Sequence, residues 1–243
     1  MRIPRVYCEV ELAIGEIISL PPDTSHHLRN VLKRAMQDKI IVFNGKGGNY
    51  HGKIVDDSKK GVSIVINEFD QENIESTLNL NLGQALIKPD HMDLIIQKSV
   101  EIGASAVTPL ITKRSVIKLS TERMANKLRH WRQIAVSASE QSGRTNIMRV
   151  NEPTKFSSWI ESKEQGLNIY LHPTNAQRIE DLPLKAKSVN LLIGPEGGFD
   201  TAEIHFLQST NWYSISLGRR ILRAETASIT MLSILQHRFG DMH

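Results

Sequence analysis

Two glycine-bearing loops near the C-terminal end of the sequence carry residues whose types and spacing suit chemistry. The first, 194–198, reads Gly-Pro-Glu-Gly-Gly and follows the apolar run 189–193. The second, 217–227, carries three arginines and a glutamate after the strand-like run 213–217. Both are typical of strand-to-helix turns, where ligands bind in open α/β sheets. A carboxylate beside several guanidinium groups favours a cationic or neutral small ligand next to a polyanion.

The first loop differs from a phosphate-binding turn. Gly197 and Gly198 permit positive φ and leave room for a ligand against the backbone, whereas Pro195 removes an N–H donor. Asp200 and Glu203 predict a helix N-cap, so an acid occupies the place where a phosphate would sit. Neither glycine fingerprint for nucleotide phosphates occurs in the sequence. A tight turn that serves only packing is the alternative.

The second loop places guanidinium groups beside a carboxylate. Arg219, Arg220 and Arg223 suit phosphate or a planar anion with oxygens at its edge. Glu225 stands two residues from Arg223, and Thr226 is predicted to cap the helix that follows. Solvated charges at a helix start are the alternative.

The composition is that of an ordinary globular chain with one large or two modest domains. The 243 residues are 40% hydrophobic and 23% charged, and no stretch approaches the roughly 18 apolar residues of a membrane span. The N-terminus lacks a signal-peptide pattern and the single cysteine, Cys8, has no internal partner, which favours a reducing cytoplasm. The nine histidines show no metal-ligand spacing, so we expect no metal site.

The first part of the chain has the pattern of a small β-domain. Strand patterns at 39–43, 49–55 and 62–69, separated by turn residues, predict a three-stranded meander. An earlier strand is expected at 5–12, and a short helix at 26–34 that starts near Ser25. This order predicts a small barrel. The polar run 70–77 lacks periodicity and marks a linker, so we expect domains at 1–72 and 73–243.

From residue 78 onward, strand and helix patterns alternate. The expected strands are 78–82, 106–111, 167–171, 189–193 and 213–217, and the expected helices are 89–103, a long one between Ser120 and Gly143, and 225–239. Such alternation predicts a mainly parallel sheet covered by helices on both faces.

The basic residues gather in clusters that would suit a polyanion. Residues 1–72 hold equal numbers of basic and acidic side chains, so the net charge of +4 lies entirely in the remainder. The clusters are Lys113 and Arg114 with Lys118, Arg144 with Arg149, and Arg219 and Arg220 with Arg223. Solvated surface is the alternative for each cluster.

The paired loops resemble those of a known family. The run 194–199 followed by Leu-Gly-x-x-Ile-Leu-Arg-x-Glu-Thr-Ala at 217–227 is similar to the motifs of the RsmE family of ribosomal RNA methyltransferases, in the SPOUT superfamily. The runs 1–5, 97–103 and 140–144, together with Pro109, also look like positions of this family. Two positions depart from its pattern: Lys33 stands where arginine is usual, and Gln37 where a turn glycine is common.

The resemblance implies both architecture and reaction. It implies an α/β fold with a C-terminal SPOUT-type trefoil-knotted parallel sheet, helices on both faces, and a small N-terminal PUA-like β-barrel that helps to hold RNA. It also implies a homodimer that uses S-adenosyl-L-methionine to methylate N3 of a specific uridine in small-subunit (16S) ribosomal RNA. The partner would be this RNA or the small ribosomal subunit, in the cytoplasm, with no metal and no membrane.

We expect the two loops and the end of the strand 167–171 to hold the methyl donor. The residues expected there are Leu171, His172, Gly194, Pro195, Glu196, Gly197, Gly198, Leu217, Gly218, Ile221, Leu222 and Thr226. Arg223 would stabilise the uracil anion or hold a phosphate, and Glu225 would orient Arg223 or accept the N3 proton. The residues expected to bind RNA are Arg2, Arg5, Lys113, Arg114, Arg144, Arg219 and Arg220.

Two other functions fit parts of the sequence. An RNA-binding or ribosome-assembly protein would keep the barrel and the basic clusters, with the loops serving only structure. A Rossmann-type nucleotide or NAD enzyme would explain the alternation of strands and helices, but its phosphate fingerprint is missing. Binding of S-adenosylmethionine would exclude the first alternative, and competition with NAD tests the second.

Overall fold

The computed structural model describes residues 3–58, 61–115, 121–163, 165–174 and 176–243. The chain forms two compact units. Unit 1 comprises Met1–Glu75 and Ser139–Ile147, and unit 2 comprises Ser76–Ala138 and Met148–His243. Within the described ranges, none of the helices combines the length and the apolar character needed to span a bilayer.

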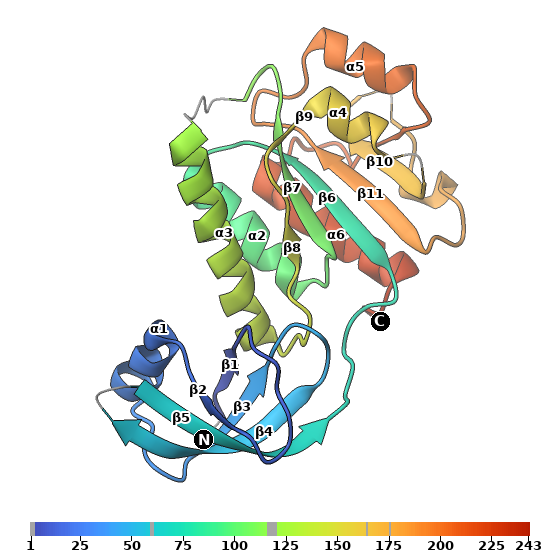
Figure 1. The fold of residues 1–243 in the computed structure, drawn as a ribbon. Coiled ribbons are helices and arrows are strands. Elements are labelled where there is room, and N and C mark those ends of the chain that lie inside the picture. The colour runs from blue at the N-terminus through green and yellow to red at the C-terminus, as the bar shows by residue number, and fades with distance from the viewer. Residues whose placement is uncertain (1–2, 59–60, 116–120, 164, 175) are drawn as a thin grey trace. The chain divides into compact units, whose positions relative to one another are not determined.

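Unit 1 contains a five-stranded sheet of order β1-β3-β4-β5-β2. The strands β3 (Lys39–Phe43), β4 (Asn49–Ser58) and β5 (Gly61–Asp70) form the predicted antiparallel meander (Figure 1). β1 (Arg5–Tyr7) pairs parallel with β3 and is shorter than the stretch expected there. β2 (Ile17–Ser19), which pairs antiparallel with β5, was not predicted, because three residues are too few to show a period.

The helical segment of unit 1 begins earlier than expected. α1 (Pro22–His26) starts at a proline, whose missing N–H has no intrahelical role in the first turn, and it continues as the π-helical turn η1 (His27–Val31). Leu28 of η1 is fully buried in the apolar core of unit 1. The strand residues of this core alternate along the chain, as in Ile40 with Val42 and Ile64 with Ile66.

The turn after η1 holds two non-glycine residues in the left-handed region. Lys33 has a φ of 49° and Gln37 a φ of 71°. A residue with a Cβ adopts this region at a cost of about 1–2 kcal/mol. The N–H of Gln37 donates to the carbonyl of Ile54 (2.8 Å), which holds the turn against β4. Position 37 therefore has a backbone conformation that favours glycine, and this chain adopts it with glutamine.

Unit 2 is built on a parallel sheet of order β12-β10-β11-β6-β7-β8, with β9 also paired to β7. Every strand pair described in this sheet is parallel, which confirms the prediction. The strands are β6 (Asn79–Ala85), β7 (Ala106–Ile111), β8 (Arg149–Val150), β9 (Thr154–Lys155), β10 (Leu167–Leu171), β11 (Ser188–Ile193) and β12 (Tyr213–Ile215). A 3₁₀ turn, η2 (Ile179–Asp181), lies between β10 and β11.

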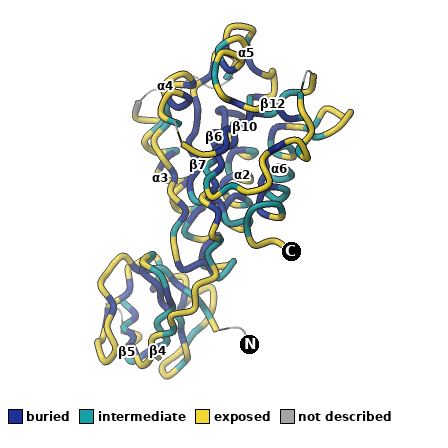
Figure 2. The backbone as a smooth tube through the Cα atoms, turned by 90° about the vertical axis from the view of Figure 1, so that its right-hand side faces the viewer, coloured by how far each residue is buried: buried dark blue, intermediate teal, exposed yellow. Residues whose placement is uncertain are grey.

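Helices cover both faces of this sheet. Leu191 packs in a cluster with α2 (Pro89–Glu101), α3 (Thr121–Ser142) and α6 (Ala224–Phe239), and its neighbour Leu192 packs in another with α4 (Phe156–Glu161) and α5 (Thr201–Gln208). Successive strand residues point to opposite faces. Burial on both faces explains why β11 is buried from Val189 to Ile193, with Asn190 as the one polar residue in this run. The strands of unit 2 are largely dark blue in Figure 2.

The helix ends agree in part with the sequence signals. Gly103 and Gly143 follow α2 and α3 with φ values of 90°, as the predicted stops require. Asp200 caps α5, with Glu203 completing the capping box. The predicted cap Ser120 lies outside the described residues. Thr226 as the cap of the last helix is wrong, because α6 begins at Ala224 after Arg223 and Thr226 falls inside its first turn.

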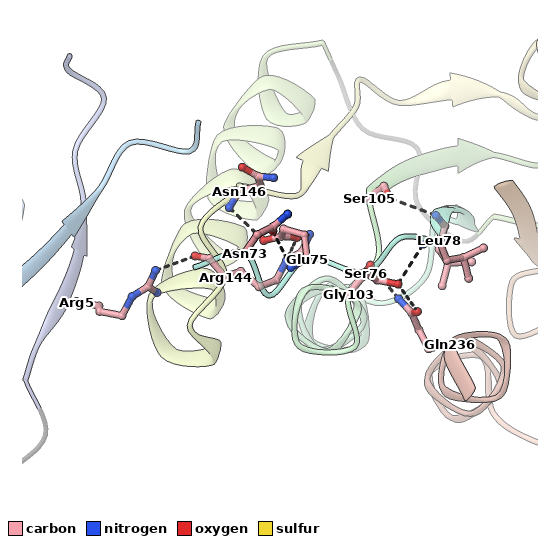
Figure 3. A network of polar contacts seen from close by, with 11 residues as sticks. Arg5, Asn73, Glu75, Ser76, Leu78, Gly103, Ser105, Arg144, Asn146 and Gln236 are labelled. Atoms are coloured by element: carbon pink, nitrogen blue, oxygen red, sulfur yellow. Dashed lines mark hydrogen bonds and ion pairs between the residues drawn. The ribbon is translucent and has the colours of Figure 1, made fainter. Parts of the chain in front are cut away.

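Each unit has its own polar network (Figure 3). In unit 1, the Arg144 guanidinium donates to Glu75 Oε2 from Nε (2.9 Å) and Nη2 (2.6 Å), and the N–H of Asn146 donates to Oε1 (3.1 Å). In unit 2, Ser76 Oγ donates to Gln236 Oε1 (2.8 Å), and Gln236 Nε2 donates to the carbonyl of Gly103 (3.1 Å).

Candidate functional site

A cavity of about 830 Å³ lies at the carboxyl ends of three neighbouring strands of unit 2. Most of its walls come from residues 171–173 at the end of β10, 193–199 at the end of β11, and 215–227 at the end of β12, without Arg219 and Thr226. Parallel strands end at the same edge of a sheet, so loops that are distant in sequence converge there. The volume is within the range of sites that enclose small organic ligands.

The loop after β11 is a tight turn closed by its own backbone. The N–H of Gly198 donates to the carbonyl of Pro195 (2.8 Å), and Gly198 has a φ of 68°. A Cβ at Gly194 would lie 3.2 Å from the ring of Phe199, which is buried beneath the loop. Glycine at these two positions therefore allows both the turn and its close packing.

Glu196 presents its carboxylate to the start of α2. Its Oε1 accepts a contact from the N–H of Lys88 (3.4 Å), the residue that precedes the first turn of this 13-residue helix. A helix N-terminus favours negative charge, because its first N–H groups are unpaired and the helix dipole is positive there. The position of this acid is therefore favourable although the side chain is exposed.

Two basic residues after β7, Lys113 and Arg114, contact the loop after β11 and the start of α5. Arg114 Nη1 donates to the carbonyl of Gly197 (2.9 Å) and lines the cavity. The N–H of Lys113 donates to Glu203 Oε1 (2.9 Å), and its Nζ reaches Asp200 (3.3 Å). The N–H of Ala202, followed by Lys113, lowers the pKa of Asp200, so this cap stays ionised.

The loop after β12 turns at Gly218 and ends at the start of α6. Gly218 has a φ of 103°, and its N–H donates to Ser216 Oγ (3.3 Å). Arg223 is extended at the N-cap position and exposed, whereas Glu225, in the first turn of α6, is half-buried. Both line the cavity.

Glu225 faces a histidine from α2. Its Oε2 lies 3.5 Å from His91 Nδ1, and the side chains are 13% and 30% exposed. His91 also lines the cavity, so the two helices that pack against each other both contribute to this wall.

His172 forms the wall after β10. Its N–H donates to the carbonyl of Ile215 (3.0 Å), which ties the ends of β10 and β12 together. Its Nδ1 lies 2.6 Å from the carbonyl oxygen of Thr174. The backbone N–H of Thr174 also lies near Nδ1 (3.3 Å), so the backbone of Thr174 holds the ring at this wall.

The structure brings almost all the expected donor-site residues into this cavity. Those that line it are Leu171, His172, Gly194, Pro195, Glu196, Gly197, Gly198, Leu217, Gly218, Ile221 and Leu222, with Arg223 and Glu225 beside them. Thr226 is exposed on α6 and does not line it. Ile221 is 90% exposed, so its large apolar side chain stands at the surface of the loop.

The residues expected to bind RNA divide into two groups. Arg114 and Arg220 line the cavity, Arg219 is exposed on the loop after β12, and Lys113 is exposed beside Arg114. Arg5 donates instead to Asn49 Oδ1 (2.8 Å) and to the carbonyls of residues 139 and 144, and Arg144 is paired with Glu75. Both guanidinium groups make their contacts within unit 1, which argues against RNA contacts from Arg5 and Arg144. Arg2 lies outside the described residues.

The contribution of α2 to the cavity was not predicted from the sequence. Lys88 and His91 line the cavity although they lie about a hundred residues before its loops. Pro89 marked the start of the helix, but no sequence signal relates this start to the later loops. Among the described residues, no group of three or more His, Cys, Asp or Glu side chains is arranged to hold a metal.

The cavity fits a neutral or cationic organic ligand better than a nucleotide phosphate. Its deep wall is apolar, with Ile193 and Ile215 buried, and its loops expose backbone groups near Gly194 and Gly218. The Pro195 turn offers few donors, and the first turn of α6 already contains a carboxylate. These features fit S-adenosylmethionine, which combines an adenosine, a sulfonium and an amino acid.

Comparisons with known proteins agree with this fit. A model of the RNA methyltransferase domain family matches residues 74–236, and a model of the RNA methyltransferase PUA domain matches residues 20–67. The chain is 35% identical over 242 residues to the ribosomal RNA small subunit methyltransferase E of Buchnera aphidicola subsp. Schizaphis graminum, covering 99% of this chain and 98% of that one. It is 30% identical to the Bacillus subtilis protein of the same name, covering 90% of each.

Two solved structures are similar over the full chain. A methyltransferase from Legionella pneumophila, in complex with the cofactor SAM, is 36% identical with a TM-score of 0.96, covering 99% of this chain and 100% of that one. A ribosomal RNA small subunit methyltransferase E from Neisseria gonorrhoeae, bound to S-adenosyl methionine, is 30% identical with a TM-score of 0.92, covering all of both chains.

Proposed function

This chain belongs to the ribosomal RNA small subunit methyltransferase E family, and we propose that it methylates N3 of a specific uridine in 16S ribosomal RNA with S-adenosylmethionine as donor. One observation carries the proposal: three loops at the carboxyl ends of β10, β11 and β12 enclose a cavity with a carboxylate wall and an arginine rim. The two solved relatives, each of which binds this donor, support it.

The donor's adenosine would lie among the backbone groups of Gly194, Leu217 and Leu222, with His172 closing the third wall. Glu196 offers acceptors for ribose hydroxyls or a negative charge beside the sulfonium. When bound, the donor supplies an electrophilic methyl group, so no metal is needed. The task of the protein is then to align a nucleophile with it.

Uracil N3 carries a proton and becomes a competent nucleophile when that proton leaves. The charge that develops on O2 and O4 calls for a fixed cation, and the Arg223 guanidinium stands at the cavity to meet it. The Glu225 carboxylate, in the first turn of α6, accepts the proton. Arg223 and Glu225 are thus assigned as the catalytic pair.

RNA binds across the rim of the cavity in this proposal. Lys113, Arg114, Arg219 and Arg220 supply the phosphate contacts, because all four are exposed and Arg114 and Arg220 also line the cavity. The RNA affinity should fall with rising salt, by about 0.7 units of log–log slope for each contact to single-stranded RNA.

The remaining expectations on architecture belong to the same proposal. Residues 1–72 serve as a PUA-like β-barrel that helps to hold RNA, and residues 73–243 as a SPOUT methyltransferase domain with a C-terminal trefoil knot. The enzyme acts as a homodimer in the cytoplasm, on ribosomal RNA or the small subunit. The matches to the PUA and RNA methyltransferase domain models support the two domain roles, and the relatives' name supports the RNA substrate.

The test measures donor binding and methyl transfer separately. Calorimetry with S-adenosylmethionine should detect binding, without competition from NAD, and small subunits from cells lacking the protein should gain one methyl group on uridine. In Arg223→Ala, kcat should fall about 10²-fold while donor affinity stays within about threefold. Arg219→Ala is the matched control, expected to weaken RNA binding with little change in kcat. Turnover near normal in Arg223→Ala would remove this residue from the mechanism.

A further inference from the structure

His91 and Glu225 meet across two helices in a way that the proposed reaction has not yet used. His91 lies in the first turn of α2 and Glu225 in the first turn of α6. Their facing atoms, Nδ1 and Oε2, are buried and 3.5 Å apart. Neither atom has a hydrogen-bond partner in the part of the chain that the structure describes. The imidazole of His91 and the carboxylate of Glu225 are therefore each other's nearest polar partner among the described residues.

A carboxylate in this position needs a cationic partner. The Glu225 side chain is only 13% exposed, so little solvent reaches its carboxylate. Its proposed role, accepting the N3 proton, requires the charged form of the carboxylate. The unpaired N–H groups at the start of α6 favour the charge but lie on the backbone. Aiming the carboxylate requires a partner side chain.

Other charged groups surround the pair, but none forms an ion pair with Glu225 among the described residues. Those that line the same cavity are Lys88, Arg114, His172, Glu196, Arg220 and Arg223. Arg114 is engaged with the carbonyl of Gly197, and Glu196 with the start of α2. His91 is thus the one described side chain within ion-pair distance of Glu225.

We propose that His91 is a positioning residue: in its protonated form it pairs with Glu225 and keeps this carboxylate aimed into the cavity for proton acceptance. This rests on the proposed function, because the role of Glu225 does. His91 itself does not contact the reacting atoms. A fixed cation of similar reach should therefore replace it.

The first experiment compares His91→Leu and His91→Lys in methyl transfer over a range of pH. Leucine leaves Glu225 without a partner, so kcat should fall tenfold or more and the acid limb of its pH profile should move to higher pH. Lysine should restore kcat to within about threefold of the wild-type value and bring the acid limb of the pH profile back to its wild-type position. The control is His130→Leu, because His130 forms a similar pair with Asp93 of α2 (2.7 Å) outside the cavity and should leave both unchanged.

The second experiment needs neither donor nor RNA. Urea unfolding is measured for His91→Leu, Glu225→Gln and the double variant. If the two side chains interact, the double variant should change the unfolding equilibrium constant about fivefold less than the product of the two single effects. Independent effects, or a His91→Lys variant as slow as His91→Leu, would overturn the positioning role. If the wild-type protein binds no donor and transfers no methyl group, the proposed function fails, whereas the unfolding cycle still decides whether the pair exists.

Discussion

Arg144 was expected to bind RNA, and its internal pairing leads to a sharp prediction about stability. Its guanidinium makes two contacts of 2.6 and 2.9 Å to one oxygen of Glu75, and the two side chains are 9% and 12% exposed. The other oxygen of Glu75 accepts from the N–H of Asn146. We predict that Arg144→Met greatly destabilises unit 1, because it leaves a buried carboxylate without its cation.

The size of the effect follows from burial and distance. Two unit charges about 4 Å apart attract by about 4 kcal/mol at an effective dielectric constant of about 20. Removing one member of a buried pair costs about 3–5 kcal/mol, whereas replacing both with apolar groups costs much less. We therefore expect Arg144→Met to lower the free energy of unfolding by about 3–5 kcal/mol. The double variant Arg144→Met/Glu75→Leu should recover most of this loss.

Urea unfolding of the single and double variants measures both numbers, and a salt titration of RNA binding separates the two roles of Arg144. If the pairing is internal, Arg144→Met should leave the salt dependence of RNA affinity unchanged, while Arg220→Ala should reduce its slope. A loss of less than about 1 kcal/mol in Arg144→Met, together with a reduced slope, would refute this reasoning and return Arg144 to the RNA surface.

Three further predictions concern stability. Gln37→Gly should raise the free energy of unfolding by up to about 1 kcal/mol, seen as a melting temperature a few degrees higher, because Gln37 has a φ of 71°. Gly83→Ala should lower it by about 1–3 kcal/mol in urea unfolding, since a Cβ there would lie 2.6 Å from the buried Trp159 ring. Burial raises the pKa of Glu140, although the Tyr7 N–H opposes this. The contribution of Glu140 to stability is therefore present below its unfolded pKa of about 4.3 and is lost as pH rises through its folded pKa. The free energy of unfolding of Glu140→Gln, relative to that of the wild type, should accordingly rise between about pH 4 and pH 7.

The long elements and the cavity loops could be predicted because their signals are local. β7 and β10 have the bounds that the apolar runs indicate, and α2 ends before Gly103 because glycine accepts the left-handed conformation. The loops 194–198 and 217–223 meet because parallel strands share a carboxyl edge. Short elements such as β2 and α4 span too few residues to show a period. The start of α5 was indicated instead by its cap, Asp200 with Glu203.

The partners of charged side chains could not be predicted, because they depend on contacts between distant segments. Arg144 and Arg220 look alike in sequence, yet one is paired with Glu75, 69 positions away, and the other lines the cavity. His91 meets Glu225 only because α2 packs on α6. A basic cluster thus identifies a polyanion surface only after its internal acceptors are known.

The helix starts around the cavity fit the proposed sulfonium ligand better than a phosphate. Glu196 contacts the start of α2, Asp200 and Glu203 cap α5, and Glu225 lies in the first turn of α6. Nucleotide-binding proteins leave such helix starts open, so that backbone N–H groups can receive phosphate oxygens. Here each start already carries an acid of the chain itself, which repels an incoming phosphate and attracts a cation. The missing phosphate fingerprint and the acidic helix starts therefore have the same physical meaning: this cavity is not built to receive a phosphate group.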